Sequence, residues 1–140
     1  MSRIFWDTGL FVHLFSGADA RSERVASLRQ RMLERQDELC TSALTLAEVL
    51  VKPLQRGDEA LRERYERALA QAVRVIPFDR DAARLYAEIR QDRSIRAPDA
   101  FQLACAGAAR VDLFIANDDR LGRCTVPGVQ FIASLERAFL

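Results

Sequence analysis

The chain has 140 residues, of which 49% are apolar and 29% charged, and its formal net charge is +1. These values are typical of one ordinary globular domain and exclude disordered, collagen-like and coiled-coil chains. A net charge near zero also argues against a broadly basic surface, so any nucleic-acid contact is expected to be a local patch.

Five short runs of β-branched, aromatic and other apolar residues are predicted to be strands. They comprise residues 3–6, 39–43, 73–78, 113–116 and 129–132. Each run is almost continuously hydrophobic, which is typical of strands that are covered on both faces. This pattern favours a parallel sheet between two layers of helices.

Helical periodicity fills most of the chain between these strands. Residues 21–38 place Val25, Leu28 and Met32 on one stripe. Two further amphipathic helices are indicated by Leu61, Tyr65, Ala68, Leu69 and Ala72, and by Ala82, Leu85, Tyr86 and Ile89. A more apolar helix is predicted from Pro98 to about Ala109. Strands that alternate with helices predict an α/β fold, a three-layer α/β/α domain with a central parallel sheet.

The chain is predicted to be a single domain, residues 1–140, because its candidate breaks, around Gly17 and around residues 57–58, are short turn-like stretches. The first seven residues lack the apolar core of a signal peptide, and no run approaches the roughly 18–20 apolar residues that span a bilayer. We therefore expect a cytoplasmic protein without membrane contact. Its cysteines, Cys40, Cys105 and Cys124, are expected to be reduced thiols, with Cys105 in the core.

Acidic residues follow several of the predicted strands. Asp7 comes directly after the first strand, Glu48 follows the second at the start of a helix, and Asp118 follows the fourth. Asp99 comes after Pro98 in the first turn of the apolar helix. Because ligands of open α/β sheets bind beyond the carboxyl ends of the strands, these positions are candidates for a functional site.

Each acid also has a purely structural explanation. Asp7 fits a solvated turn, and Thr45 with Glu48 has the spacing of a helix capping box. Asp99 is favoured by the dipole at a helix start, and Asp118 fits an Asx turn or a helix cap. Taken singly, none of the four indicates a function.

Together, the four carboxylates are expected to meet at one edge of the sheet. Like charges a few ångströms apart do not all stay ionised without a counter-charge, so either raised pKa values or a divalent cation must relieve the repulsion. An all-oxygen ligand set without cysteine or histidine selects Mg²⁺ or Mn²⁺ over zinc. Metals held by carboxylates in this way are suited to cutting phosphodiester bonds.

The chain resembles the PIN domain, in particular the VapC-like toxin ribonucleases of bacterial toxin–antitoxin pairs. The resemblance runs nearly from end to end and rests on four motifs in this order: Asp7-Thr8, Thr45-Leu46-Ala47-Glu48, Ala97-Pro98-Asp99-Ala100 and Asn117-Asp118. It implies a flavodoxin-like α/β fold, Mg²⁺ or Mn²⁺ as cofactor and endonucleolytic cutting of RNA. It also implies a homodimer that is inhibited by a small cognate antitoxin.

By this resemblance, the catalytic and metal-binding residues are Asp7, Glu48, Asp99 and Asp118. Thr8, Arg96 and Asn117 are predicted to contact the substrate or support the site.

The chain departs from the family's pattern at two positions. Ala116 stands where the family often has threonine or serine, and Gly9 where it often has serine or asparagine. Ala116 leaves open whether Asp118 binds the metal directly or through Asn117 and water. Asp119 is an adjacent alternative ligand.

Other polar residues have competing interpretations. His13, the only histidine, stands in an apolar stretch, residues 10–15, and is interpreted as a packed helix residue. That stretch either packs under the sheet or faces a dimer mate or an antitoxin segment. Arg90, Arg93 and Arg96 suit RNA phosphates as well as they suit a solvated charged face. Lys52 is the sole lysine among 21 basic residues. Codon usage explains this preference for arginine as well as contact with phosphate groups does.

The leading hypothesis is therefore an RNA endonuclease toxin. The alternative is a catalytically inactive PIN-like module that binds RNA or protein, against which the presence of all four acids argues. A phosphotransfer receiver or phosphatase on the same fold class would need a lysine near the site or an Asp-x-Asp pair, and Lys52 gives it little support.

Overall fold

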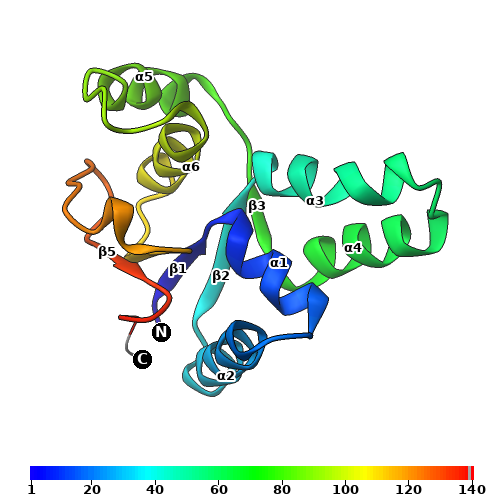
Figure 1. The fold of residues 1–140 in the computed structure, drawn as a ribbon. Coiled ribbons are helices and arrows are strands. Elements are labelled where there is room, and N and C mark those ends of the chain that lie inside the picture. The colour runs from blue at the N-terminus through cyan, green and yellow to red at the C-terminus, as the bar shows by residue number, and fades with distance from the viewer. Residues whose placement is uncertain (139) are drawn as a thin grey trace.

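A computed structural model describes residues 1–138 and 140. Within these residues, five parallel strands form one sheet in the order β3-β2-β1-β4-β5, with helices on both faces (Figure 1). The strands are β1 (Arg3–Trp6), β2 (Glu38–Ser42), β3 (Arg74–Ile76), β4 (Leu113–Ala116) and β5 (Phe131–Ser134). The helices are α1 (Thr8–Ser16), α2 (Ala20–Arg35), α3 (Ala43–Gln55), α4 (Glu59–Ala72), α5 (Arg80–Ile89), α6 (Ala97–Ala108) and the short 3₁₀ helix η1 (Asp119–Leu121). The predicted three-layer α/β/α fold is confirmed.

The two faces of the sheet bury separate apolar clusters. One cluster joins α5 and α6 to the sheet and contains the stacked rings of Phe5 and Phe114, with centroids 5.1 Å apart. Cys105 is buried in it, as predicted. The other cluster lies under α1 to α4 and includes the fully buried Trp6. Alternate residues of β1 therefore enter opposite clusters, which explains why the strand is apolar throughout.

Some observed ends of strands and helices differ from the predicted ends, at positions where the backbone hydrogen bonding or conformation prevents the element from continuing. Strands β1 and β4 have the predicted bounds, but β3 is shorter than residues 73–78 because Pro77 has no N–H to donate to a neighbouring strand. Strand β5 begins two residues late because the N–H of Val129 closes a turn onto Val126. Helix α2 stops before residue 38 because Gln36 adopts a left-handed φ of 60°.

The strand order places a topological switch point beside β1. The chain runs outward from β1 through β2 to β3, and then crosses to β4 on the other side of β1. In such sheets a crevice forms beyond the carboxyl ends of the two strands that flank the switch. Here these ends are followed by Asp7 and Asn117, so the fold itself brings two of the predicted site residues together.

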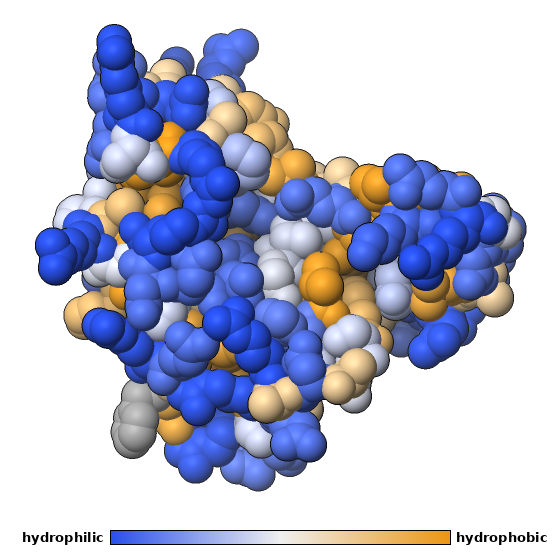
Figure 2. Space-filling view, in the orientation of Figure 1, coloured by the Kyte–Doolittle hydropathy of each residue, from blue (hydrophilic) through white to orange (hydrophobic). Residues whose placement is uncertain are grey.

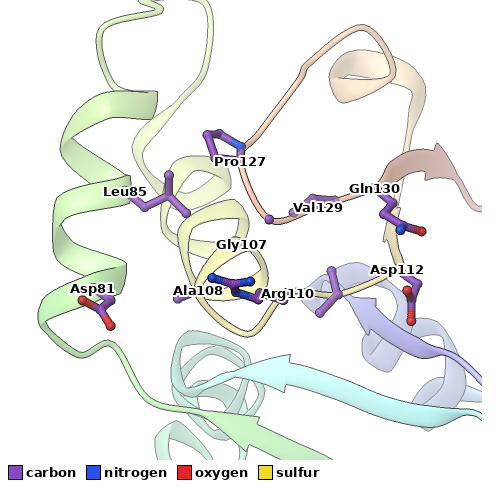
Figure 3. A pocket seen from close by; sticks show the side chains of 11 residues that line it. Asp81, Leu85, Gly107, Ala108, Arg110, Asp112, Pro127, Val129 and Gln130 are labelled. Atoms are coloured by element: carbon purple, nitrogen blue, oxygen red, sulfur yellow. The ribbon is translucent and has the colours of Figure 1, made fainter.

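A hollow of about 670 Å³ lies away from this crevice, where α6 ends and β4 begins (Figure 3). It forms where Gly107 of α6 contacts the loop before β5. Gly128 in that loop has a φ of +88°, and a Cβ there would lie 2.1 Å from the carbonyl oxygen of Gly107. Both glycines are therefore needed for close packing. The hollow contains none of the predicted site residues.

Among the residues that the structure describes, no helix has the length and apolar character needed to cross a bilayer.

Candidate active site

A pocket of about 310 Å³ lies at the switch point. Its lining combines three of the four predicted acids with two arginines and several polar residues: Asp7, Thr8, Gly9, Glu48, Arg96, Pro98, Asp99, Gln102, Asn117 and Arg120. The pocket therefore joins residues from α1, α3, α6 and the loop after β4, as the sequence predicts. Asp118 is next to it and is connected through Arg120.

Asp7 is held firmly at the base of the site. It caps α1, and its two carboxyl oxygens accept the N–H groups of Gly9 (2.9 Å) and Asn117 (3.0 Å). Burial raises the pKa of Asp7 to about 6, although these two N–H donors lower it. The carboxylates of Asp99 and Asp118 raise it further. Ionisation of Asp7 therefore costs more in this pocket than in water, and a bound cation would offset that cost.

Asp99 lies in the first turn of α6, with a side chain only 18% exposed. Burial raises the pKa of its carboxyl; Arg96 lowers it, while Asp118 and Glu48 raise it. Arg96 lies 3.9 Å and Arg120 3.5 Å from the same Asp99 oxygen. Both distances are long for an ion pair, so neither arginine replaces a directly bound cation.

Asp118 caps η1 through the N–H of Arg120 and receives that residue's Nε at 3.0 and 2.9 Å. The predicted cap is confirmed. Asp119, the alternative ligand, instead pairs with Arg137 at 3.3 Å. Arg120 contacts both Asp118 and Asp99, so its guanidinium acts as an internal counter-charge to these acids.

The capping-box interpretation of Thr45 and Glu48 is wrong. Helix α3 begins at Ala43, and its cap is Ser42, whose hydroxyl accepts the N–H of Leu44. Thr45 is fully buried and lies three residues after this cap, inside the first turn of the helix. Glu48 is therefore free of a capping role, and its carboxylate accepts the hydroxyl of Thr8 at 2.7 Å.

Asn117 fills the space that Gly9 leaves. A Cβ at Gly9 would lie 2.7 Å from Cγ of Asn117, which explains the absence of the side chain that the family often has there. The Asn117 amide oxygen contacts Nε2 of His13 at 3.0 Å and Nη1 of Arg21 at 3.3 Å. His13 also lies 3.8 Å from Asp19, so both of its ring nitrogens face protein groups. This supports its interpretation as a packed helix residue.

The three arginines before Asp99 have different surroundings. Arg90 donates to the carbonyl of Ile95 at 2.9 Å and stabilises the loop between α5 and α6. Arg93 is exposed, and Arg96 lines the pocket. Only Arg96 is therefore placed to meet a ligand of this site.

Sequence reasoning missed two residues of the pocket, Gln102 and Arg120. A signal for Gln102 was present, because it is a long polar residue three positions after Asp99 in an otherwise apolar helix. Arg120 carries no such signal among 20 arginines.

The residues fit a divalent cation. Within residues 1–138 and 140, no three acidic, histidine or cysteine side chains are already gathered into a ligand shell. Nevertheless, Asp7 is buried with a raised pKa, the carboxylates of Asp99 and Asp118 raise that pKa further, and the acidic side chains offer only oxygen donors. Such donors suit hard cations such as Mg²⁺.

The family model of the PIN domain matches residues 4–126. The chain belongs to the PIN domain family, as the sequence motifs indicated, and PIN nucleases generally depend on a divalent metal. A comparison of the chain with curated proteins found no match.

Solved structures of toxin–antitoxin proteins share the fold. A toxin–antitoxin complex from Klebsiella pneumoniae is 25% identical, with a TM-score of 0.66 over 90% of this chain and 94% of that one. VapBC2 from Rickettsia felis, bound to a DNA fragment from its promoter, is 14% identical, with a TM-score of 0.74 over 94% and 98%. VapC20 of Mycobacterium tuberculosis, a toxin that cleaves the sarcin–ricin loop, is 22% identical, with a TM-score of 0.62 over 82% and 89%.

Proposed function

We propose that this PIN-domain protein is an RNA endonuclease that depends on Mg²⁺ or Mn²⁺ and serves as the toxin of a toxin–antitoxin pair. The observation that carries the proposal is the pocket at the switch point, where Asp7, Glu48 and Asp99 present oxygen ligands within a PIN fold. Asp118 is proposed to complete the ligand set from the end of the neighbouring strand.

Each acid contributes to the proposed chemistry in its own way. When bound, the divalent cation supplies positive charge beside a phosphate and lowers the pKa of an attacking water. Asp7 is fixed by two backbone N–H groups, so it needs little rearrangement to act as a ligand. Glu48 is oriented by Thr8, and the carboxylates of Asp99 and Asp118, which contact Arg120 in the structure, would be further oxygen ligands for the cation.

The arginines beside the pocket are proposed to bind the RNA backbone. Arg96 and Arg120 both reach Asp99 in the structure, and their guanidinium groups are suited to phosphate oxygens. Asn117 is proposed to keep the substrate side of the pocket in shape through its contact with His13.

The fragment ends test this mechanism. Incubated with total RNA and Mg²⁺ or Mn²⁺, the protein is expected to leave 5′-phosphate and 3′-hydroxyl ends, because water attack on phosphorus expels the 3′-oxygen. The same reaction in EDTA should give no cleavage. Attack by the 2′-hydroxyl would instead leave a cyclic phosphate, and it needs an acid–base pair that His13 alone does not provide.

Cyclic-phosphate ends or full activity in EDTA would contradict the metal mechanism. Failure to cleave any RNA would favour the alternative, a PIN-like module that binds RNA or protein without cutting.

An apolar groove is the proposed binding site for the antitoxin. It lies between α1 and the projecting α3–α4 pair, has a volume of about 520 Å³, and includes Val12, Phe15 and Val51. Figure 2 shows orange and pale residues in this hollow, between the body of the molecule and the projecting arm. Val12 is 51% exposed, so only part of the apolar stretch 10–15 packs under the sheet.

The homodimer also remains a prediction, which sedimentation at micromolar concentration would test.

Expression in a bacterial host tests the toxin and its partner together. Induction of the chain alone is expected to stop growth, and co-expression of its cognate antitoxin should restore growth. Val12→Asp places a charge in the apolar groove, so this variant should stay toxic but escape the partner. Harmless expression of the unmodified chain without a partner would contradict the toxin proposal.

A further inference from the structure

Beneath the acidic pocket, a hydrogen-bond network that is buried at Thr41, Ser42, Thr45 and Gln102 and reaches the surface at Glu48 connects β2, α1, α3 and α6. Its side chains are Thr8, Thr41, Ser42, Thr45, Glu48 and Gln102. Gln102 is at the centre and only 4% exposed. Its amide nitrogen contacts the hydroxyls of Thr8 at 3.0 Å and Thr45 at 2.9 Å, and its amide oxygen accepts the hydroxyl of Ser42 at 2.5 Å.

Counting the hydroxyl and amide hydrogens determines which group donates and which accepts at each contact of this network. Thr41 is the donor both to the carbonyl oxygen of Trp6 at 2.8 Å and to the hydroxyl of Thr45 at 2.7 Å, so these two acceptors share its single hydroxyl hydrogen. Thr45 therefore keeps its own hydroxyl hydrogen for the contact with Thr8 at 3.1 Å. Both amide hydrogens of Gln102 point to the two threonine hydroxyls, which therefore accept.

The count leaves one available acceptor for the hydroxyl hydrogen of Thr8. Thr45 accepts from both Thr41 and Gln102, so it donates to Thr8 and does not accept from it. Thr8 therefore donates its own hydrogen to Glu48, 2.7 Å away, whose carboxylate oxygen accepts it. Ser42 keeps the Gln102 amide in this orientation, since a flipped amide would put its NH₂ group against the hydroxyl of Ser42 and its oxygen against Thr8.

We propose that Gln102 is a positioning residue for the metal site: it directs the hydroxyl of Thr8 onto Glu48 and thereby holds that carboxylate facing the pocket before the metal arrives. This inference rests on the proposed function, because it takes Glu48 to be a metal ligand. Partners that orient a metal ligand commonly improve metal affinity about 10- to 100-fold. A leucine at this position would fill the core without the cost of burying an amide, so a polar side chain here needs a reason beyond packing.

The test is a titration of the purified, metal-free protein with MnCl₂ by calorimetry, without RNA. Gln102→Met keeps the length of the side chain and removes the amide. It is expected to weaken Mn²⁺ binding about tenfold, and Thr8→Val is expected to do the same. The double variant should bind no more weakly than Thr8→Val alone, because Gln102 acts through Thr8.

A matched control separates positioning from stability. Ser22 is also buried and donates to the carbonyl oxygen of His13 at 2.6 Å, in a part of α2 that does not contact the acidic pocket. Ser22→Ala should lower the melting temperature without changing Mn²⁺ affinity. If Gln102→Met does not fold, Ser42→Ala takes its place, since it frees the amide to flip and should weaken binding about threefold, again without adding to Thr8→Val.

The outcomes distinguish the two proposals. Absence of Mn²⁺ binding by the unmodified protein would overturn the metal site and this inference together. Binding that Gln102→Met leaves unchanged, or losses that add fully in the double variant, would overturn only the role of Gln102.

Discussion

Asp99→Asn is expected to lower RNA cleavage by a factor on the order of a thousand while the protein stays folded. The substitution keeps the shape of the side chain but removes the negative charge that the proposed metal requires. Asp99 caps no helix in the structure, and its arginine contacts are long, at 3.5 and 3.9 Å. The fold therefore depends little on this carboxylate, and the loss should appear in the cleavage rate at saturating RNA.

Asp81→Asn is the matched control. Asp81 also lies in the first turn of a helix, α5, but it lines the hollow of Figure 3 and not the acidic pocket. Its substitution should leave cleavage within about twofold of the unmodified protein. If Asp99→Asn and Asp81→Asn behave alike, the pocket at the switch point is not the catalytic site.

Mn²⁺ is expected to raise the melting temperature by roughly 6–10 °C at a hundredfold excess over its Kd. Binding to the native state alone adds about 2.7 kcal/mol at that concentration, and a domain of this size gains about 3 °C per kcal/mol. Asp99→Asn should lose most of this shift. It should also raise the metal-free melting temperature, since burial and the carboxylates of Asp118 and Glu48 disfavour its ionised form.

The same melting experiment has a pH dependence with a definite sign. The carboxyl of Asp7 titrates near 3.8 when unfolded and near pH 6 when folded, so between these values the native state binds more protons. The contribution of Asp7 to the free energy of unfolding of the metal-free protein therefore falls as the pH rises from about 4 to about 6. The Mn²⁺-induced shift should grow over the same interval, because metal binding needs an ionised carboxylate. Equal melting temperatures in EDTA and in millimolar Mn²⁺ at about pH 7.5 would contradict the proposed site.

The sequence alone determined the layers and the place of the acids. The 3.6-residue period of a helix depends on local side-chain order, so the stripe of Val25, Leu28 and Met32 was predicted correctly and is buried. Asp7 and Asp118 were placed because they come within two residues after parallel strands, whose carboxyl ends must meet at one edge. Their assignment as metal ligands remains a prediction.

Tertiary structure alone decided how the side chains around these acids are used. Thr45 was interpreted from its spacing to Glu48, but burial against Thr41 and Gln102 gives it a different partner. Gln102 and Ser42 are 60 residues apart, and no local pattern contains such a pair. The period of a helix or strand shows which face of an element is buried, but not which residue of another element meets it. That depends on how the elements pack, because a buried polar group must find a partner among whatever groups the packing places beside it.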